Sequence, residues 1–517
     1  MMSDLDVSSA PVQALSGVDP SDAPIHAFGT DVETVPRILY GANNDRHGDR
    51  DDGEDHCHLH ATRQISKERS LQGSLPLTLS DRIPIETFEN IIDWMESHAL
   101  LAAALVSRVW HPRAVHNLYH TVRLQSRKDF DLLVHQLQTS PRIKQRLSTT
   151  RELCVHRDYP DLFHRDYRRA CLEQGLDSLN LDVLPIVFAN SLPALRVLDI
   201  AGFSHPPMHP TFYLALSHFK HVTSLRLHGI MLRNVTQLQQ IICALLGLKE
   251  VVLELLIPIH QFSGTRFRTP CETRLKRLEV HADPADSDEL ITSIHPFDPI
   301  ITWLVDSGVC SSLSELVISR VFRDDPYPGP YPRYRYCSNG LLAKQVNRLL
   351  ETSGSSLTSF RGDQNEFRFR DSRSPFSLVH NTTLSQLILY LYPRAGRKTR
   401  AWQLASQLHA ILYTVRSHEL RHIAIHLRGL SPENLKEHDL ADTPALRNYH
   451  DVMEKPCFRA LTDVHVKLEF TSRPHAHDLL CNDAHKLDYL AMLTKTIFRP
   501  MLLPWHDRGI VSIDYAG

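Results

Sequence analysis

The sequence predicts an α/β protein in which a small helical unit precedes a long array of parallel strands that alternate with helices. Three observations indicate this fold. The chain has 517 residues, more than one hydrophobic core usually serves, so an elongated array or several units are expected. One short apolar pattern recurs along most of the chain, and segments with helical periodicity lie between its copies. Hydrophobic residues make up 42% and charged residues 22%, so most of the chain can bury a core.

Residues 1–74 are expected to be a disordered tail. They are poor in aromatic residues and rich in Ser, Asp, Gly and Pro, and they include the charged stretch from Asp45 to Asp55. Such a segment cannot bury enough apolar surface to offset the entropy lost on ordering. We expect order to begin near Leu75.

Three helical segments are expected next. From Ile85 to Met95, apolar residues fall at i, i+3, i+4 and i+7 and therefore line one helix face. Pro84 suits the entrance of this helix, because it fixes φ and its missing N–H would be unpaired there. A second helix is expected from Leu100 to about Trp110, and Pro112 should end or kink it. A third apolar stretch, residues 115–124, closes the unit.

The repeated pattern places apolar residues at positions 1, 4 and 6 of a short strand. Four copies start at residues 195, 222, 248 and 275, which are 26 or 27 residues apart. A weaker copy has Leu357 and Phe360, and an early candidate ends at Leu153-Cys154-Val155. The full copies are Leu195-Leu198-Ile200, Val222-Leu225-Leu227, Leu248-Val251-Leu253, Leu275-Leu278-Val280, Leu313-Leu316-Ile318, Leu384-Leu387-Leu389, Leu420-Ile423-Ile425 and Leu461-Val464-Val466.

This spacing resembles that of leucine-rich repeats, which have one strand and one helix per repeat and bury each apolar face against the neighbouring repeats. The resemblance implies an irregular leucine-rich-repeat-like solenoid over residues 127–517. The Asn or Cys usual at position 9 is missing, and wider gaps indicate inserted loops near residues 323–338 and 361–377. The alternative is that a pattern of this kind arises easily in any leucine-rich α/β protein.

The helical unit resembles a known family of adaptor-binding motifs. Residues 83–119 read Ile83-Pro84-Ile85-Glu86, then an apolar helix, a leucine pair, Val106-Ser107-Arg108-Val109-Trp110 and Leu118-Tyr119. This order and spacing resemble the F-box, here assigned to residues 75–126, although Thr87 and Ser107 depart from the usual pattern. The layout of F-box followed by repeats is similar to that of the large divergent F-box families of fungi.

The resemblance implies protein binding. F-box helices dock on the Skp-type adaptor of a cullin–RING ubiquitin ligase, so the protein would be the substrate-recognition subunit of an SCF-type ligase, and its repeats would present a concave surface to a target protein. The alternatives are a protein-interaction scaffold that does not direct degradation, and a helical unit whose apolar residues are simply its interior. The residues to which the adaptor-binding role carries over are Pro84, Ile85, Phe88, Ile91, Ile92, Leu101, Leu105, Val106 and Trp110.

Charge and composition exclude several other classes of protein. The formal net charge of −2 argues against nucleic-acid binding by bulk electrostatics. The N-terminus lacks the basic and apolar regions of a signal peptide, and no apolar run approaches a membrane span, so no membrane partner is expected. The nine cysteines are scattered and never spaced as C-x-x-C, which favours a reducing compartment. We therefore expect an intracellular protein of the cytoplasm, the nucleus or both.

Two motifs with possible metal ligands were weighed. His418-Glu419-Leu420-Arg421-His422 matches H-E-x-x-H, which in zinc hydrolases lies on a helix. Here Leu420 is position 1 of a repeat strand, so a zinc hydrolase stays a remote alternative. The stretch from Asp55 to His60 contains close His and Cys residues but lacks a second ligand pair. No metal, no cofactor and no enzymatic activity are therefore expected.

Overall fold

The strands predicted from the repeated apolar pattern lie side by side in one parallel sheet. Twelve strands follow one another across it in chain order, with only the two short strands β5 and β7 left out of the sequence. The predicted α/β architecture with parallel strands is thus confirmed. The strands are β1 (Thr121–Leu124), β2 (Glu152–His156), β3 (Val197–Ala201), β4 (Ser224–His228), β6 (Glu250–Glu254), β8 (Arg277–Ala282), β9 (Glu315–Arg320), β10 (Ser359–Asp363), β11 (Gln386–Leu391), β12 (His422–Leu430), β13 (Asp463–Phe470) and β14 (Val511–Ala516).

The computed structural model describes residues 84–156, 181–202, 209–232, 234–254, 257–258, 271–282, 297–320, 340–363, 376–391, 401–430, 444–470 and 483–516. The expected tail, residues 1–74, lies outside these ranges, as does all of the loop near 323–338. Among the described residues, no helix is both long enough and apolar enough to cross a bilayer.

The register of the sheet explains the spacing of the pattern. Position 4 of each repeat pairs with position 4 of the next, for example Leu198 with Leu225 and Leu225 with Val251. The same row continues through Leu387, Ile423 and Val464 on later strands. In the repeats identified from the sequence, the residues at position 1 precede their strands and are at most 2% exposed. One stacked row of side chains at each position therefore builds a core that runs through the whole array.

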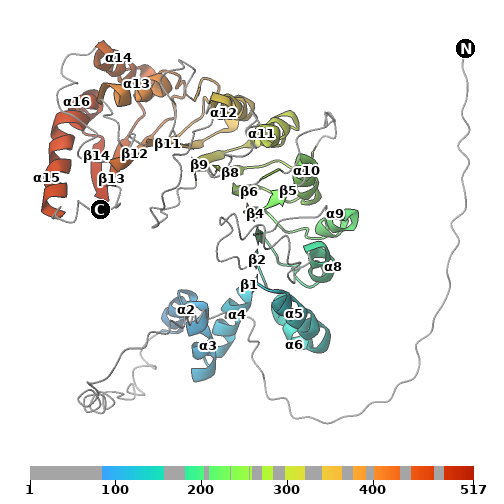
Figure 1. Ribbon diagram of the computed structural model, residues 1–517. Helices are drawn as coiled ribbons and strands as arrows, with labels where there is room; N and C mark the ends of the chain where they lie inside the picture. Colours follow the sequence, from blue (N-terminus) through green and yellow to red (C-terminus); the bar gives the residue numbers. More distant parts are fainter. Residues whose placement is uncertain are drawn as a thin grey trace, which may run out of the picture. The chain divides into compact units, whose positions relative to one another are not determined.

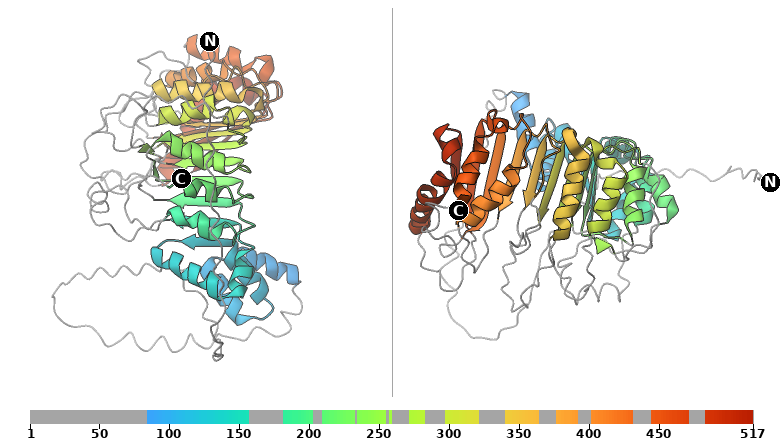
Figure 2. Two further views of the ribbon diagram at one scale, coloured as in Figure 1. Left: turned by 90° about the vertical axis from the view of Figure 1, so that its right-hand side faces the viewer. Right: turned by 90° about the horizontal axis from the view of Figure 1, so that it is seen from above.

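Helices alternate with the strands and lie along one face of the sheet (Figures 1 and 2). Because side chains alternate along a strand, positions 4 and 6 point to these helices and positions 3, 5 and 7 point to the opposite face, which carries no helix of the described residues. The helices of this layer are α5 (Arg127–Thr139), α6 (Pro141–Leu147), α8 (Leu184–Phe188), α9 (Pro210–Leu216), α10 (Val235–Ala244), α11 (Phe297–Asp306), α12 (Gly340–Ser353), α13 (Ala401–Leu412), α14 (Pro444–Met453), α15 (Asp483–Leu493), α16 (Arg499–Met501) and α17 (Leu503–Asp507).

The N-terminal unit has three helices, α2 (Ile85–Asp93), α3 (Ser97–Val106) and α4 (His111–His120). Two sequence-based boundaries were wrong. Pro112 does not end the second helix: it lies in the first turn of α4, where a missing N–H costs nothing. Residues 121–124 are not helical but form β1, which pairs with β2. The helical unit therefore continues into the sheet without a linker, and Leu118 and Leu124 share one core.

The weaker repeat around Phe360 has its own packing. Gly362 stands at position 6, where the other repeats carry an apolar side chain. The Phe376 ring fills this place: a Cβ on Gly362 would lie 2.8 Å from it, and it meets the Phe360 ring edge-on at 5.3 Å. The insertion expected from residue 361 therefore begins later, because residues 361–363 belong to β10 and only 364–375 lie outside the described residues.

Candidate functional site

Helix α2 carries apolar side chains on its outer surface as well as on its inner one. Ile92, at 2% exposure, belongs to the core of the unit. Ile85 and Ile91 are 47% and 48% exposed, and Trp94, which follows the last turn, is 89% exposed. Ile91 and Trp94 are three residues apart and so lie on one side of the helix. An indole of this size left in water indicates a surface that something else covers.

Helix α3 is apolar on all sides. Its sequence, SHALLAAALV, contains no Asp, Glu, Lys or Arg, and Leu100 and Ala103 are its buried residues. At its end, Leu105 is 77% and Val106 is 79% exposed, and Val109 in the following turn is 66% exposed. A surface helix normally has a polar outer face, so an apolar outer face is typical of a helix that binds a partner.

We refer to Ile85, Ile91, Trp94, Leu105, Val106 and Val109 as the apolar surface of the three-helix unit. The nine residues proposed from the sequence divide into three groups. Pro84, Ile85, Ile91, Leu105 and Val106 are exposed; Phe88, Leu101 and Trp110 are half-buried; and Ile92 is buried. The Phe88 and Trp110 rings contact each other at 5.5 Å, which joins α2 to the start of α4. Ile92 is therefore placed to hold the unit together rather than to contact a partner.

The sequence analysis missed Trp94 and Val109. Trp94 does not fit the spacing of the predicted helical face, and it lies between acidic residues in Asp93-Trp94-Met95-Glu96. A large aromatic residue in an otherwise polar stretch was the available signal. Val109 lies inside the motif from Val106 to Trp110, where the analysis counted only the first and last residues.

The turn from α2 into α3 is tied to α4 by a polar network. Arg113 donates hydrogen bonds from Nε and Nη2 to the two carboxylate oxygens of Asp93, at 2.8 and 2.5 Å. Asn117 Nδ2 donates a further hydrogen bond to Asp93 Oδ1 at 2.8 Å. The hydrogen bonds from Arg113 and Asn117 lower the pKa of Asp93 to about 2. The carboxylate is therefore charged at any physiological pH, and the network fixes the spacing of α2 and α4.

On the face of the sheet opposite the helices, charged residues are numerous but paired. Arg226 Nη1 lies 3.1 Å from Glu152 Oε1, and Arg277 Nη2 lies 2.9 Å from Glu279 Oε2. Towards the C-terminus, Glu469 pairs with Arg428 and Lys467, each at 2.8 Å. Since both signs alternate along this face, it does not present the uniform basic surface that nucleic-acid binding requires.

The H-E-x-x-H residues lie in a geometry different from that of zinc hydrolases. His418 and Glu419 lie in the turn before β12, and His422 is the first residue of that strand. Leu420 between them is fully buried. The two imidazoles are thus not on one helix face, which the zinc hydrolase geometry needs.

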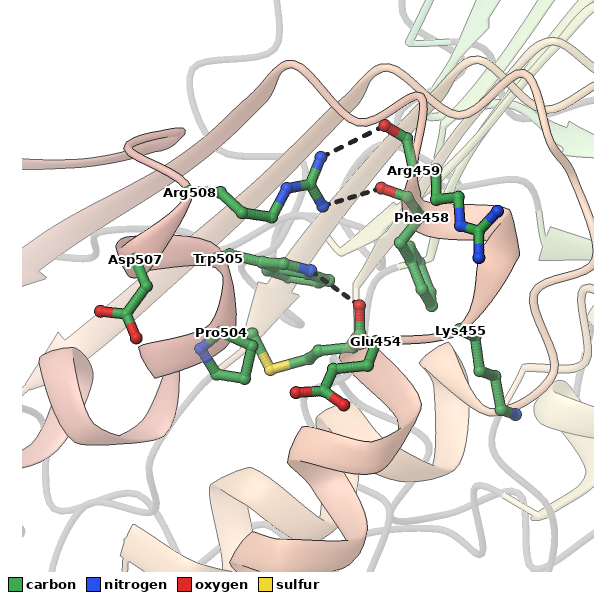
Figure 3. A pocket seen from close by; sticks show the side chains of 9 residues that line it. Glu454, Lys455, Phe458, Arg459, Pro504, Trp505, Asp507 and Arg508 are labelled. Atoms are coloured by element: carbon green, nitrogen blue, oxygen red, sulfur yellow. Dashed lines mark hydrogen bonds between the residues drawn. The ribbon is translucent and has the colours of Figure 1, made fainter.

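A pocket of about 470 Å³ lies near the C-terminus between α14 and α17 (Figure 3). Its polar groups serve the protein's own backbone. Trp505 Nε1 donates to the Met453 carbonyl at 3.2 Å, and Arg508 donates to the carbonyls of Phe458 and Arg459 at 2.9 and 3.3 Å. Because the Trp505 and Arg508 donors already bind backbone carbonyls, the pocket is where α14 and α17 pack together. We assign no ligand to it.

No model of a known protein family matches the chain, and a search of curated proteins finds no match to its sequence. The functional argument therefore rests on the residues themselves, and above all on the apolar surface of the three-helix unit.

Proposed function

We propose that the protein is the substrate-recognition subunit of an SCF-type ubiquitin ligase, in which the three-helix unit is an F-box and the parallel array is an irregular leucine-rich-repeat solenoid. In this role it binds proteins and catalyses no reaction itself. The observation that carries the proposal is the end of α3, where Leu105 and Val106 are more than three-quarters exposed. These residues fall at the place in the F-box-like motif where adaptor contacts are expected.

The chemistry of this surface supports a protein partner. Exposed Leu, Ile, Val and Trp side chains can make van der Waals contacts and bury apolar surface, but they form few hydrogen bonds. They therefore suit an apolar groove on another protein. Trp94 has the size and exposure of an interface anchor. The core residues Ile92, Leu100, Ala103, Ala114 and Leu118 hold the three helices together beneath this surface.

The parallel array supplies a second surface for the target protein. Along the face opposite the helices, side chains at positions 3, 5 and 7 of successive strands form rows, and neighbouring rows include His, Glu and Arg. A target protein would contact these outward side chains. They can vary between proteins without disturbing the apolar rows that form the core behind them. Its chemistry fits a polar, folded protein target better than an extended apolar peptide.

Co-elution tests the proposal. The full chain would be co-expressed with the Skp-type adaptor and passed over a size-exclusion column. We expect one complex for the wild type and loss of the complex for Ile91→Asp, which puts a charge on the apolar surface. The matched control is Ile186→Asp on α8, since Ile186 is similarly exposed, at 54% against 48% for Ile91. A wild-type chain that is folded but elutes without the adaptor contradicts the proposal.

Ubiquitin transfer separates degradation from scaffolding. A scaffold that binds the adaptor but does not present a target would co-elute in the same way. With the complete ligase reconstituted, we expect ubiquitin chains on proteins captured by the wild type and none on proteins captured with Ile91→Asp. Capture without ubiquitin transfer would favour the scaffold function.

A further inference from the structure

Three potential metal ligands meet on the face of the sheet opposite the helices. Cys154 on β2 is the direct register partner of Asp199 on β3, and His156 lies two residues beyond Cys154 on the same face. The Cys154 sulfur, an imidazole nitrogen of His156 and a carboxylate oxygen of Asp199 all lie within 4.8 Å of one another. The sequence alone could not show this group, because residues 154 and 199 come together only through strand register.

Two atoms of this group are buried without a hydrogen bond. His156 Nε2 and Asp199 Oδ1 lie 3.3 Å apart, yet neither has a hydrogen-bond partner among the described residues. Asp199 as a whole is 7% exposed. A buried, unpaired carboxylate oxygen costs on the order of 1–3 kcal/mol or more, so such an oxygen needs a cation or a donor to compensate it.

A second histidine approaches Asp199 from the next strand. His228 on β4 directs Nε2 to within 3.6 Å of Asp199 Oδ1, while its Nδ1 donates to Glu254 Oε2 at 2.8 Å. A carboxylate that fixes one imidazole nitrogen and leaves the other for a metal is a common arrangement in zinc proteins. His156 and His228 are the register partners on either side of Ala201.

The backbone beyond these residues is fixed. β3 and β4 are followed by Gly202 and Gly229, which have φ of 79° and 58°. The Gly202 N–H donates to the carbonyl of His228 at 2.9 Å, and the Gly229 N–H donates to the carbonyl of Glu254 at 2.8 Å. These hydrogen bonds hold the ends of three adjacent strands together, so the ligands are placed by rigid elements rather than by loops.

We propose that Cys154, His156, Asp199 and His228 bind a zinc ion and so clamp β2, β3 and β4 together. One sulfur, two imidazole nitrogens and one carboxylate oxygen are ligands that Zn²⁺ accepts in tetrahedral sites. With usual zinc–ligand bonds of roughly 2.0–2.3 Å, neighbouring ligand atoms should lie about 3.3–3.6 Å apart. The separations of 3.3 and 3.6 Å from Asp199 Oδ1 to the two imidazole nitrogens have this length.

A nearby polar cluster on the same face, around His281, serves as a comparison. His281 Nε2 lies 2.8 Å from Glu279 Oε1, and its Nδ1 lies 2.6 Å from Ser319 Oγ. Both ring nitrogens are therefore satisfied by hydrogen bonds within the protein. The group around Asp199 contains similar residue types, but two of its buried atoms make no hydrogen bond, and this contrast is what points to a cation.

The test uses Co²⁺ as a probe, because a thiolate bound to Co²⁺ gives a charge-transfer absorption band. Zn²⁺ added afterwards displaces the Co²⁺ and abolishes the band. The full chain would be stripped with a chelator under reducing conditions and titrated with Co²⁺. We expect one equivalent per chain with a thiolate band, loss of the band in Cys154→Ser, and an unchanged band in His281→Ala. In Glu254→Gln, where the support of His228 is weakened, the Zn²⁺ affinity should fall about 10- to 100-fold.

Other outcomes overturn the proposal. Cys57 lies among histidines at 56, 58 and 60, so a band lost in Cys57→Ser but kept in Cys154→Ser would place the metal elsewhere. Absence of any thiolate band in the folded wild type would contradict the proposed site. Should Cys154→Ser fail to fold, His156→Ala, with its 42% exposed side chain, tests the same site at less structural risk. The site is independent of adaptor binding, and neither result bears on the other.

Discussion

Arg113 on α4 donates two hydrogen bonds to the carboxylate of Asp93 at the end of α2, from Nε at 2.8 Å and from Nη2 at 2.5 Å. This pair spans 20 residues of sequence and joins α2, which carries the exposed Ile85 and Ile91, to α4, which begins two residues after the exposed Val109. Neither residue has a place in the apolar surface itself. The pair therefore offers a way to disturb the geometry of the surface while leaving its chemistry intact.

We expect Arg113→Ala to lower the free energy of unfolding by about 0.5–1 kcal/mol, because both side chains are more than a third exposed and water screens their attraction. It should also weaken adaptor binding several-fold. The pKa of Asp93 is lowered to about 2, below its unfolded value, so this stability is present above about pH 4 and is lost as the pH falls through about 2. Denaturant unfolding and adaptor titration check these expectations.

The control for this variant is Arg127→Ala. Arg127 pairs with Asp131 four residues away on the same helix, at 2.9 Å, so its loss affects one helix only. We expect a cost of no more than about 0.5 kcal/mol and unchanged adaptor binding. Equal effects of the two variants on adaptor binding would show that the link between α2 and α4 does not shape the surface.

His426 on β12 predicts a loss of stability in mild acid. Burial is the largest cause that lowers the pKa of His426 to about 4; the charge of Glu469 opposes this shift, and Lys467, Arg428 and His465 favour it. Its ring stacks on Tyr390 with centroids 4.6 Å apart. Because the unfolded chain takes up the proton near pH 6.5 and the folded protein only near pH 4, stability should decrease as the pH falls through this window.

The variant His426→Phe keeps the ring and removes the titration. Between pH 7 and pH 4 we expect the wild type to lose about 1–2 kcal/mol more than this variant, a figure reduced to allow for the partial exposure of the ring. Urea unfolding at several pH values measures the difference. Parallel pH profiles for the two proteins would refute the assignment to His426.

Arg508 anchors the last strand of the array. Its guanidinium donates to the carbonyls of Phe458 and Arg459 at 2.9 and 3.3 Å (Figure 3), and to that of Leu461 at 2.8 Å. Arg508→Ala removes three hydrogen bonds to backbone carbonyls, and we expect a loss of about 1–3 kcal/mol in urea unfolding. The exposed Arg459 is the control: Arg459→Ala should change the free energy of unfolding by less than about 0.5 kcal/mol. A similar loss in both variants would mean that the hydrogen bonds of Arg508 contribute little.

Two buried cysteines should differ in reactivity. Cys243 lies 2.6 Å from Cys271, sulfur to sulfur, and the hydrogen bond from Cys243, together with those from Thr273, lowers the pKa of Cys271 to about 6. Burial raises the pKa of Cys310 to about 12. The thiolate is the reactive form, so alkylation at pH 8 followed by mass spectrometry should modify Cys271 well before Cys310. Equal rates in the folded protein would count against the thiolate at Cys271.

The apolar pattern predicted the interior strands of the array because leucine-type side chains must stack from repeat to repeat. The two ends escaped prediction for a physical reason. In the turns before β1, β2 and β14, position 1 is taken by Tyr119, Thr150 and Arg508, and the last two bind backbone carbonyls instead of filling the core. At an end of the array one neighbouring repeat is missing, so polar residues can replace the apolar row. The pattern was therefore recognised only in part at β2 and not at all at β1 and β14.

The candidate site was predicted unevenly for a similar reason. The motif located the three helices, but helical periodicity alone did not tell Ile92, which is buried, from Ile91, which is 48% exposed. Both fit an apolar face, and only the packing of α3 and α4 decides which one is covered. Likewise, no spacing in the sequence could bring Cys154 next to Asp199, because strand register sets that contact.

The most direct test of adaptor binding through α3 is the affinity of the full chain for the Skp-type adaptor, measured by calorimetry for two variants with one chemical change. Leu105→Asp alters the apolar surface, and Leu214→Asp alters α9, where the leucine is 70% exposed against 77% for Leu105. We expect Leu105→Asp to weaken binding at least about tenfold, or about 1.4 kcal/mol, and Leu214→Asp to leave it unchanged. Equal affinities for both variants and the wild type would contradict adaptor binding through this surface.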